Sequence, residues 1–201
     1  RKSLPWTTET PSNKPLAVGC VMKKIPDSKY GPRLLCQSLC LTLLLLLCPT
    51  SAEAETLTGK PYVTDGDTVK ISGERIRLEG IDAPERNQRC KDASGKGYDC
   101  GIVSTAALRN KIGRNSITCE GTKRDRYGRF LGVCYLNELD LNGWMVRNGY
   151  ALAYARYSGR YVSAEQEARE NSRGLWAGEF VAPWSWRKGE RLATGSRPHG
   201  Q

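Results

Sequence analysis

The sequence predicts an α+β fold: a small closed barrel of five strands, with three helices interleaved with the strands and following them. Short runs that alternate apolar and polar residues, separated by turn-like residues, indicate half-buried strands in the first half of residues 55–188. Three further segments carry helix-like patterns, and each ends at or near a glycine. Residues 55–201 number 147, enough for one domain with a single core.

The five strands are expected at residues 62–64, 68–72, 75–78, 117–120 and 130–136. Turn-like residues at 65–66 and 72–74 separate the first three strands. In the third strand, Ile76 and Leu78 are expected to face inward. Because successive side chains point to opposite faces of a strand, Arg77 should lie on the other face.

The three helices are expected at residues 101–112, 141–148 and 162–173. The first stops at Gly113, and the third stops at Gly174. Asp140 is expected to cap the start of the second helix, and Gly149 to close it. Beyond the helices, we expect Trp176, Trp184 and Trp186 to form a structural cluster, followed by a flexible polar tail, 189–201.

The N-terminal part has the composition of an export signal. Met22 is the first methionine, so residues 1–21 are interpreted as an upstream extension outside the native protein. Basic residues, an apolar run at 34–48 and a small-x-small site at 52–54 predict a Sec-type signal peptide, 22–54. The apolar run is shorter than the roughly twenty residues of a spanning helix. We therefore expect a secreted or periplasmic protein, membrane-anchored only if the signal is not cleaved.

Cysteine usage agrees with export, because an even set remains after residue 54: Cys90, Cys100, Cys119 and Cys134. Of the three possible connectivities we favour Cys90 with Cys100, which closes the loop after an acidic motif. Cys119 and Cys134 then flank a hairpin whose turn is 125–128. A zinc site is disfavoured, because there is no Cys-x-x-Cys pair and the single histidine, His199, lies in the tail.

The charge balance is basic but does not identify a partner. The whole chain has a formal net charge of +10, and residues 55–201 hold 24 Lys and Arg against 18 Asp and Glu. A basic balance favours polyanions such as nucleic acids through counterion release. Plain solubility explains a modest charge equally well.

Acids and arginines alternate in three islands that packing does not require: residues 65–68, 77–85 and 125–129. Four acids without a nearby histidine suit a hard cation such as Ca²⁺, which takes oxygen ligands. Two arginines beside them suit a phosphate, because the guanidinium fork matches its oxygens. Together these side chains predict a metal-assisted phosphodiester nuclease.

The same islands resemble the staphylococcal nuclease (thermonuclease) family over roughly residues 60–176: Asp-Gly-Asp-Thr, then Arg-x-x-x-x-Asp-x-Pro-Glu, then Asp-x-Tyr-Gly-Arg. The resemblance implies an oligonucleotide/oligosaccharide-binding (OB) barrel with added helices, which the strand pattern also fits. It further implies hydrolysis of DNA and RNA to products with 3′-phosphates and 5′-hydroxyls. We expect the enzyme to act as a monomer.

A Ca²⁺ site is expected at the rim where two strands end. Asp67 and Asp82 are the expected direct ligands. The family resemblance adds the backbone carbonyl of Ala83, the residue before the proline. Asp65 and Glu85 are expected to act through bound waters, although Asp65 could equally serve as a simple turn cap.

The expected catalytic residues are Glu85, Arg77 and Arg129. Glu85 is the general base that holds the attacking water, and Pro84 fixes the backbone just before it. Arg77 and Arg129 bind the phosphate oxygens and stabilise the transition state. Arg129 is expected to act by its charge, because an arginine does not give up its proton at ordinary pH.

Two further pairs are expected to bind nucleotide. By the resemblance, Arg126 and Tyr127 contact a terminal phosphate, and Tyr154 and Tyr157 lie in the segment that supplies stacking tyrosines. Stacking tolerates any base and suits an enzyme with little sequence preference. The alternative is that these tyrosines pack against the barrel.

Two functions from different classes compete. The first is an exported, Ca²⁺-dependent nuclease. The second is a non-catalytic barrel of the same fold that binds nucleic acid or a partner protein. The presence of the whole expected set favours the nuclease: Asp67, Arg77, Asp82, Glu85 and Arg129.

Overall fold

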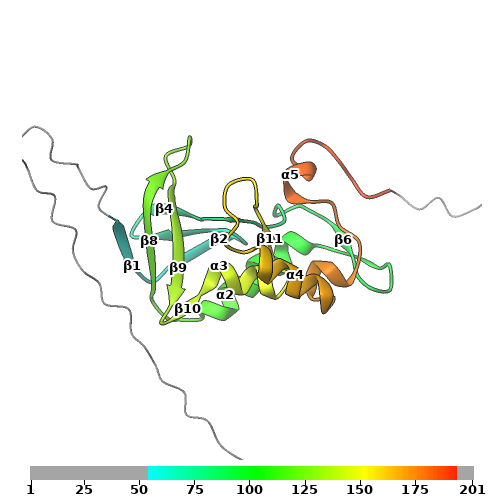
Figure 1. Ribbon diagram of the computed structural model, residues 1–201, viewed down its shortest axis with the longest axis horizontal. Coiled ribbons are helices and arrows are strands. Elements are labelled where there is room, and N and C mark those ends of the chain that lie inside the picture. The colour runs from blue at the N-terminus through cyan, green and yellow to red at the C-terminus, as the bar shows by residue number, and fades with distance from the viewer. Residues whose placement is uncertain (1–53, 194–201) are drawn as a thin grey trace, which may run out of the picture. The chain divides into compact units, whose positions relative to one another are not determined.

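The computed structural model describes residues 54–193 (Figure 1). The upstream extension expected at 1–21, nearly all of the signal peptide expected at 22–54, and the tail beyond residue 193 with His199 lie outside the described residues. Within the part of the chain that the structure describes, no helix has the length and apolar character needed to cross a membrane.

One curled sheet of seven strands forms the centre of the fold (Figure 1). In spatial order its main path is β1 (Glu55–Gly59), β8 (Ile117–Arg124), β9 (Phe130–Leu136), β4 (Glu74–Leu78), β3 (Thr68–Ile71) and β2 (Tyr62–Asp65), and β10 (Leu139–Asp140) pairs with β9. Strands β4 and β9 run parallel, and the other neighbours are antiparallel. All five expected strands are present in this sheet.

The sheet curls into a half-barrel, in keeping with the barrel expected from the sequence, and only Lys60 and Pro61 separate its two end strands in the chain. Its path ends at β1 and β2, and these strands do not pair with each other in the described structure. Strand β1, which was not expected, instead pairs with the outer edge of β8 from Glu55 opposite Gly121 to Gly59 opposite Ile117. The arrangement is α+β and consistent with the OB fold of the resemblance.

Alternation along the strands builds the core, as predicted. Ile76 and Leu78 of β4 are buried, and Arg77 lies on the outer face between them. The inner face packs against the helices through large buried side chains: Val69, Ile71, Ile76, Leu78, Phe130, Leu108, Ile112, Leu141 and Met145. The outer face of β4 is therefore free to present charged groups.

The three expected helices are α2 (Cys100–Ile112), α3 (Leu141–Arg147) and α4 (Val162–Glu170). Helix α3 contacts β9 and α4, and α2 contacts β2. Asp140 caps α3 as predicted, accepting a bond of 2.9 Å from the Gly143 N–H. Helix α4 ends before the expected residue 173, because Asn171 bonds back to the Glu167 carbonyl and Ser172 adopts a left-handed φ of 48°.

Short elements complete the domain: β5 (Ile81–Asp82) pairs with β11 (Leu152–Ala153), β6 (Cys90–Lys91) pairs with β7 (Gly97–Tyr98), and η1 (Gly174–Ala177) and α5 (Pro183–Trp186) follow α4. The expected three-tryptophan cluster is partly wrong. Trp176 and Trp184 pack around a small second core. Trp186 lies instead under the guanidinium of Arg191, 3.7 Å from its ring centroid.

Two disulfides join Cys90 to Cys100 and Cys119 to Cys134, the connectivity that the sequence favoured. Cys119 and Cys134 stand directly opposite each other on β8 and β9 and are fully buried. The first bridge holds the loop after Glu85 to the start of α2.

We expect the Cys119–Cys134 bridge to contribute about 3 kcal/mol to the free energy of unfolding, since it closes a loop of about 15 residues. The test uses a C90A/C100A variant, in which Cys119–Cys134 is the one bridge left among residues 54–193. Urea unfolding of that variant before and after reduction measures the difference. An unchanged midpoint after complete reduction would contradict the prediction.

Candidate active site

Asp67 stands at the tight turn between β2 and β3. Gly66 and Asp67 are the two turn residues, and Asp65 Oδ1 accepts a bond of 3.1 Å from the Asp67 N–H, the turn-capping role considered for Asp65. A Cβ on Gly66 would lie 2.0 Å from Ser104 Oγ and 2.7 Å from Ala83 Cβ. Glycine therefore lets the turn pack closely against α2 and the segment after β5.

The Asp67 carboxylate is buried and fully hydrogen-bonded. Oδ1 accepts from Arg77 Nη1 at 2.6 Å and from the Thr68 hydroxyl at 3.1 Å, and Oδ2 accepts from the Ala83 N–H at 2.9 Å. Burial raises the pKa of Asp67 to about 6, although the charge of Arg77 opposes this rise. Positive charge beside this buried carboxylate therefore stabilises its ionised form.

Arg77, on the outer face of β4, forms ion pairs with two carboxylates that lie far apart in the sequence. Its Nη1 contacts Asp67, and its Nη2 donates to Asp82 Oδ1 at 2.8 Å. Burial alone would lower the pKa of Arg77, but Asp67 and Asp82 outweigh that effect and raise it. Arg77 therefore remains a fixed cation between the two expected metal ligands.

A second guanidinium, from Arg187 just after α5, covers the other side of Asp82. Nη1 of Arg187 donates to Asp82 Oδ1 at 3.0 Å, and Nη2 donates to Oδ2 at 2.6 Å. Nη1 also donates to Glu85 Oε1 at 2.7 Å. The Asp82 side chain is 0% exposed, so both of its oxygens face cations and not water.

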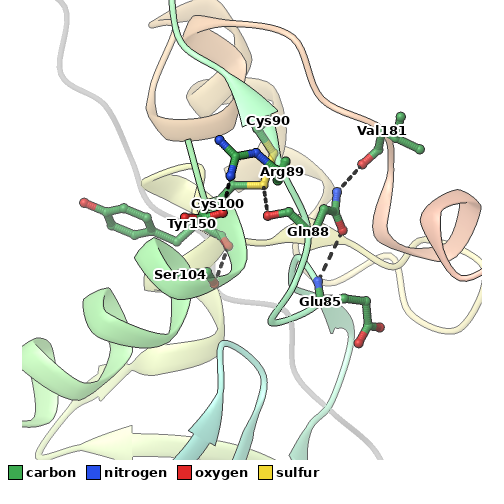
Figure 2. Close-up of a disulfide and its surroundings, with 9 residues drawn as sticks. Glu85, Gln88, Arg89, Cys90, Cys100, Ser104, Tyr150 and Val181 are labelled. Carbon is green, nitrogen blue, oxygen red and sulfur yellow. Dashed lines mark hydrogen bonds and ion pairs between the residues drawn. A yellow bond between two sulfur atoms is a disulfide. The ribbon is translucent and has the colours of Figure 1, made fainter. Parts of the chain in front are cut away.

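The backbone at Glu85 is held from both sides (Figure 2). The Glu85 N–H donates to Gln88 Oε1 at 3.2 Å, and the buried Gln88 donates from Nε2 to the Val181 carbonyl at 2.7 Å. A Cβ on Gly101 would lie 1.8 Å from the Glu85 carbonyl oxygen, so the first turn of α2 packs directly on this backbone. The Glu85 side chain itself is 39% exposed and can reach solvent.

Arg129 belongs to a separate group at the β8–β9 turn. Its Nε donates to Asp125 Oδ2 at 2.7 Å, and its Nη2 forms an ion pair with the same oxygen at 2.6 Å. The guanidinium carbons of Arg126 and Arg129 lie 4.8 and 5.5 Å from the ring centroid of Tyr127, which is 67% exposed. Within residues 54–193, no hydrogen bond or ion pair joins this turn to the Asp67 group. The strand register places it nearby, because β9 begins directly after Arg129 and runs beside β4.

The two tyrosines expected to stack on bases have different surroundings. The Tyr154 ring is stacked on Trp184 of α5, with centroids 5.5 Å apart and planes within 1°. Tyr157 meets Tyr154 edge-on at 4.8 Å and is 71% exposed. Tyr154 thus contacts two aromatic rings of the chain, whereas Tyr157 contacts only one of them, Tyr154, and is largely exposed to solvent.

The oxygen atoms around Asp67 and Asp82 fit a hard cation. In the described part of the chain no three His, Cys, Asp or Glu side chains converge into a metal cluster. Asp65 caps its turn and Glu85 binds Arg187, which leaves two carboxylates and the Ala83 carbonyl as direct candidates. Ca²⁺ accepts such a set and completes it with waters. Two guanidinium groups on Asp82 indicate that this position accepts positive charge.

A family model described as "Staphylococcal nuclease homologue" matches residues 75–178, just over half of the chain. The chain belongs to the staphylococcal nuclease family. The succinoglycan biosynthesis protein ExoI of Rhizobium meliloti is 41% identical over 135 residues, 66% of this chain and 71% of that protein. An uncharacterized endonuclease of Escherichia coli O157:H7 is 38% identical over 133 residues, 62% of this chain and 80% of its own length. A micrococcal nuclease of Shigella flexneri is 33% identical over 151 residues, 66% and 80% of the two chains.

Membership of the staphylococcal nuclease family identifies the chain as an endonuclease that acts on phosphodiester bonds. Sequence reasoning missed two residues that shape its site. Gln88 carries no motif signal, and its role depends on a partner 93 residues away. Arg187 lies beyond the family match and 105 residues from Asp82, so no local pattern could have revealed it.

Proposed function

We propose that this protein is an exported, Ca²⁺-dependent nuclease that hydrolyses DNA and RNA and leaves 3′-phosphates. One observation carries the proposal. Arg77 brings the buried carboxylates of Asp67 and Asp82 together, beside a Glu85 side chain that reaches solvent. Buried acids, a fixed cation and an accessible base are the parts that phosphodiester hydrolysis requires.

In this proposal Asp67, Asp82 and the Ala83 carbonyl hold Ca²⁺, with Asp65 and Glu85 reaching it through water. Bound Ca²⁺ supplies positive charge beside the scissile phosphate. Glu85 accepts the proton of the attacking water, and its anchored backbone keeps the carboxylate in place. The group of residues around Asp67 and Asp82 is therefore proposed as the reaction centre.

Arg77 and Arg129 bind the non-bridging phosphate oxygens, where charge accumulates in the transition state. Asp125 engages Nε and Nη2 of Arg129, and Nη1 has no hydrogen-bond partner within the described residues. Asp125 thus orients the guanidinium and leaves donors for a phosphate. Arg126 and Tyr127 are proposed to contact a terminal phosphate from the same turn.

Nucleic acid is favoured as the substrate by the surface around Arg77. Arg75 lies two residues before Arg77 on the same face of β4, and Lys70 stands opposite Arg75 on β3. Both are exposed, and neither forms an ion pair with an acid within the described residues. The exposed Tyr157 adds a ring for base stacking. Such a surface suits a polyanion better than a small phosphodiester.

Export is supported by the disulfides, which persist in oxidising compartments outside the cytoplasm. The signal peptide at 22–54, the nuclease domain at 55–188 and the flexible tail at 189–201 remain proposals, as does the monomeric state. Together they describe a protein that acts in the periplasm or outside the cell.

The test is incubation of the purified protein with single-stranded DNA and with RNA, in Ca²⁺, in Mg²⁺ and in excess chelator. We expect cleavage in Ca²⁺, less in Mg²⁺, which demands stricter octahedral geometry, and none with chelator. Products should carry 3′-phosphates, detected as ends that a polymerase extends only after phosphatase treatment. Undiminished cleavage in chelator would remove the metal from the mechanism.

A further inference from the structure

We infer that Arg187 is a tethered cation of the nuclease site that occupies Asp82 and Glu85 and must be displaced when the metal binds. The inference rests on the proposed role of Asp82 as a Ca²⁺ ligand. It assigns a function to a residue beyond the family match, which ends at residue 178.

Arg187 occupies the Asp82 oxygen atoms that a bound metal ion would use. Arg187 makes a two-point contact with Asp82, through Nη1 at 3.0 Å and Nη2 at 2.6 Å, and reaches Glu85 at 2.7 Å. Arg77 touches only Oδ1 of Asp82, whereas Arg187 covers both oxygens. A cation that ligates Oδ2 must therefore take the place of the Arg187 guanidinium.

The segment that carries Arg187 is anchored before it. Lys91 and Glu179 exchange backbone hydrogen bonds of 2.8 and 3.1 Å, and Val181 accepts from Gln88. Trp184 then stacks on Tyr154. These contacts hold the segment over the site without the help of Arg187. Its side chain is 39% exposed, so it can turn into solvent while the anchors remain in place.

Arg187 acts as a permanent charge. The guanidinium of an arginine keeps its proton at any ordinary pH. The carboxylates are released only by moving the side chain. Removing the guanidinium should therefore strengthen metal binding in the absence of any substrate.

The experiment is calorimetric titration of the purified protein with Ca²⁺, without nucleic acid, for wild type, R187Q, R187K and R191Q. We expect R187Q to bind Ca²⁺ about tenfold more tightly than wild type, because the metal no longer has to displace the guanidinium from Asp82. This gain in affinity corresponds to about 1.4 kcal/mol. R187K loses the two-point contact and should bind about threefold more tightly. R191Q removes the same charge from a residue that hydrogen-bonds only backbone carbonyls and lies against Trp186, without a hydrogen bond or ion pair to Asp82 or Glu85, and should match wild type.

An R187Q affinity equal to or weaker than that of wild type would overturn the inference while leaving the Ca²⁺ site intact. If R187Q does not fold, the R187K comparison decides in the same way, with equal affinities counting against the inference. Tightening in R191Q as large as in R187Q would reduce the effect to overall charge and also overturn it. Absence of Ca²⁺ binding in wild type and every variant would instead reject the proposed metal site, and the inference with it.

Discussion

The Glu85→Gln variant is expected to lower the turnover of DNA cleavage by about 10² or more while folding like wild type. Glutamine keeps the size of the side chain but cannot accept a proton from the attacking water. The fold should tolerate the change, because the contacts that fix this loop use the Glu85 backbone and Gln88. Arg187 loses one partner and retains its two bonds to Asp82.

The measurement is a single-turnover cleavage rate at saturating Ca²⁺, paired with binding of a short oligonucleotide by fluorescence anisotropy. Binding should survive the Glu85 change, because Arg126 and the tyrosines do not depend on it. Glu179→Gln is the matched control, since that carboxylate pairs with Lys91 away from the site and should leave the rate unchanged. Cleavage by Glu85→Gln at the wild-type rate would make Glu85 an ordinary surface acid.

The Arg129→Lys variant should also lose about 10² in turnover, although its charge is kept. Asp125 orients the guanidinium through Nε and Nη2, and a lysine ammonium cannot keep that contact and present a second donor edge to the phosphate. Arg77→Lys should weaken both turnover and phosphate binding, because Arg77 is proposed to contact the phosphate in the ground state as well as in the transition state.

The readout is kcat and KM on the same DNA substrate, with circular dichroism to confirm folding. Arg124→Lys is the control on the same hairpin: Arg124 pairs with Glu74 and Glu55 at the surface, and the change should alter neither constant. Equal losses in Arg124→Lys and Arg129→Lys would point to a general disturbance of the hairpin instead of a phosphate contact.

Local patterns were enough to predict most of the secondary structure. Alternation in β4 placed Ile76 and Leu78 inside and Arg77 outside, and the Asp140 cap fixed the start of α3. The disulfide between Cys119 and Cys134 followed from a hairpin turn that the sequence marks clearly. These features depend on neighbours in the chain, so a single sequence carries their signal.

Features that depend on distant partners were not predictable in the same way. Strand β1 was not expected, because it pairs with β8, more than fifty residues away. Within the site, the carboxylates were expected from their motifs, but the pairing of Arg187 with Asp82 depends on how the C-terminal segment folds back over the rim.

The most direct test of the proposed reaction centre is a crystal structure of the protein with Ca²⁺ and a nucleoside 3′,5′-bisphosphate, with the metal located by anomalous scattering. We expect one peak bounded by the carboxylates of Asp67 and Asp82 and the Ala83 carbonyl, with Arg77 and Arg129 on the phosphate. A metal peak at other acids, with nothing bound between Asp67 and Asp82, would contradict it.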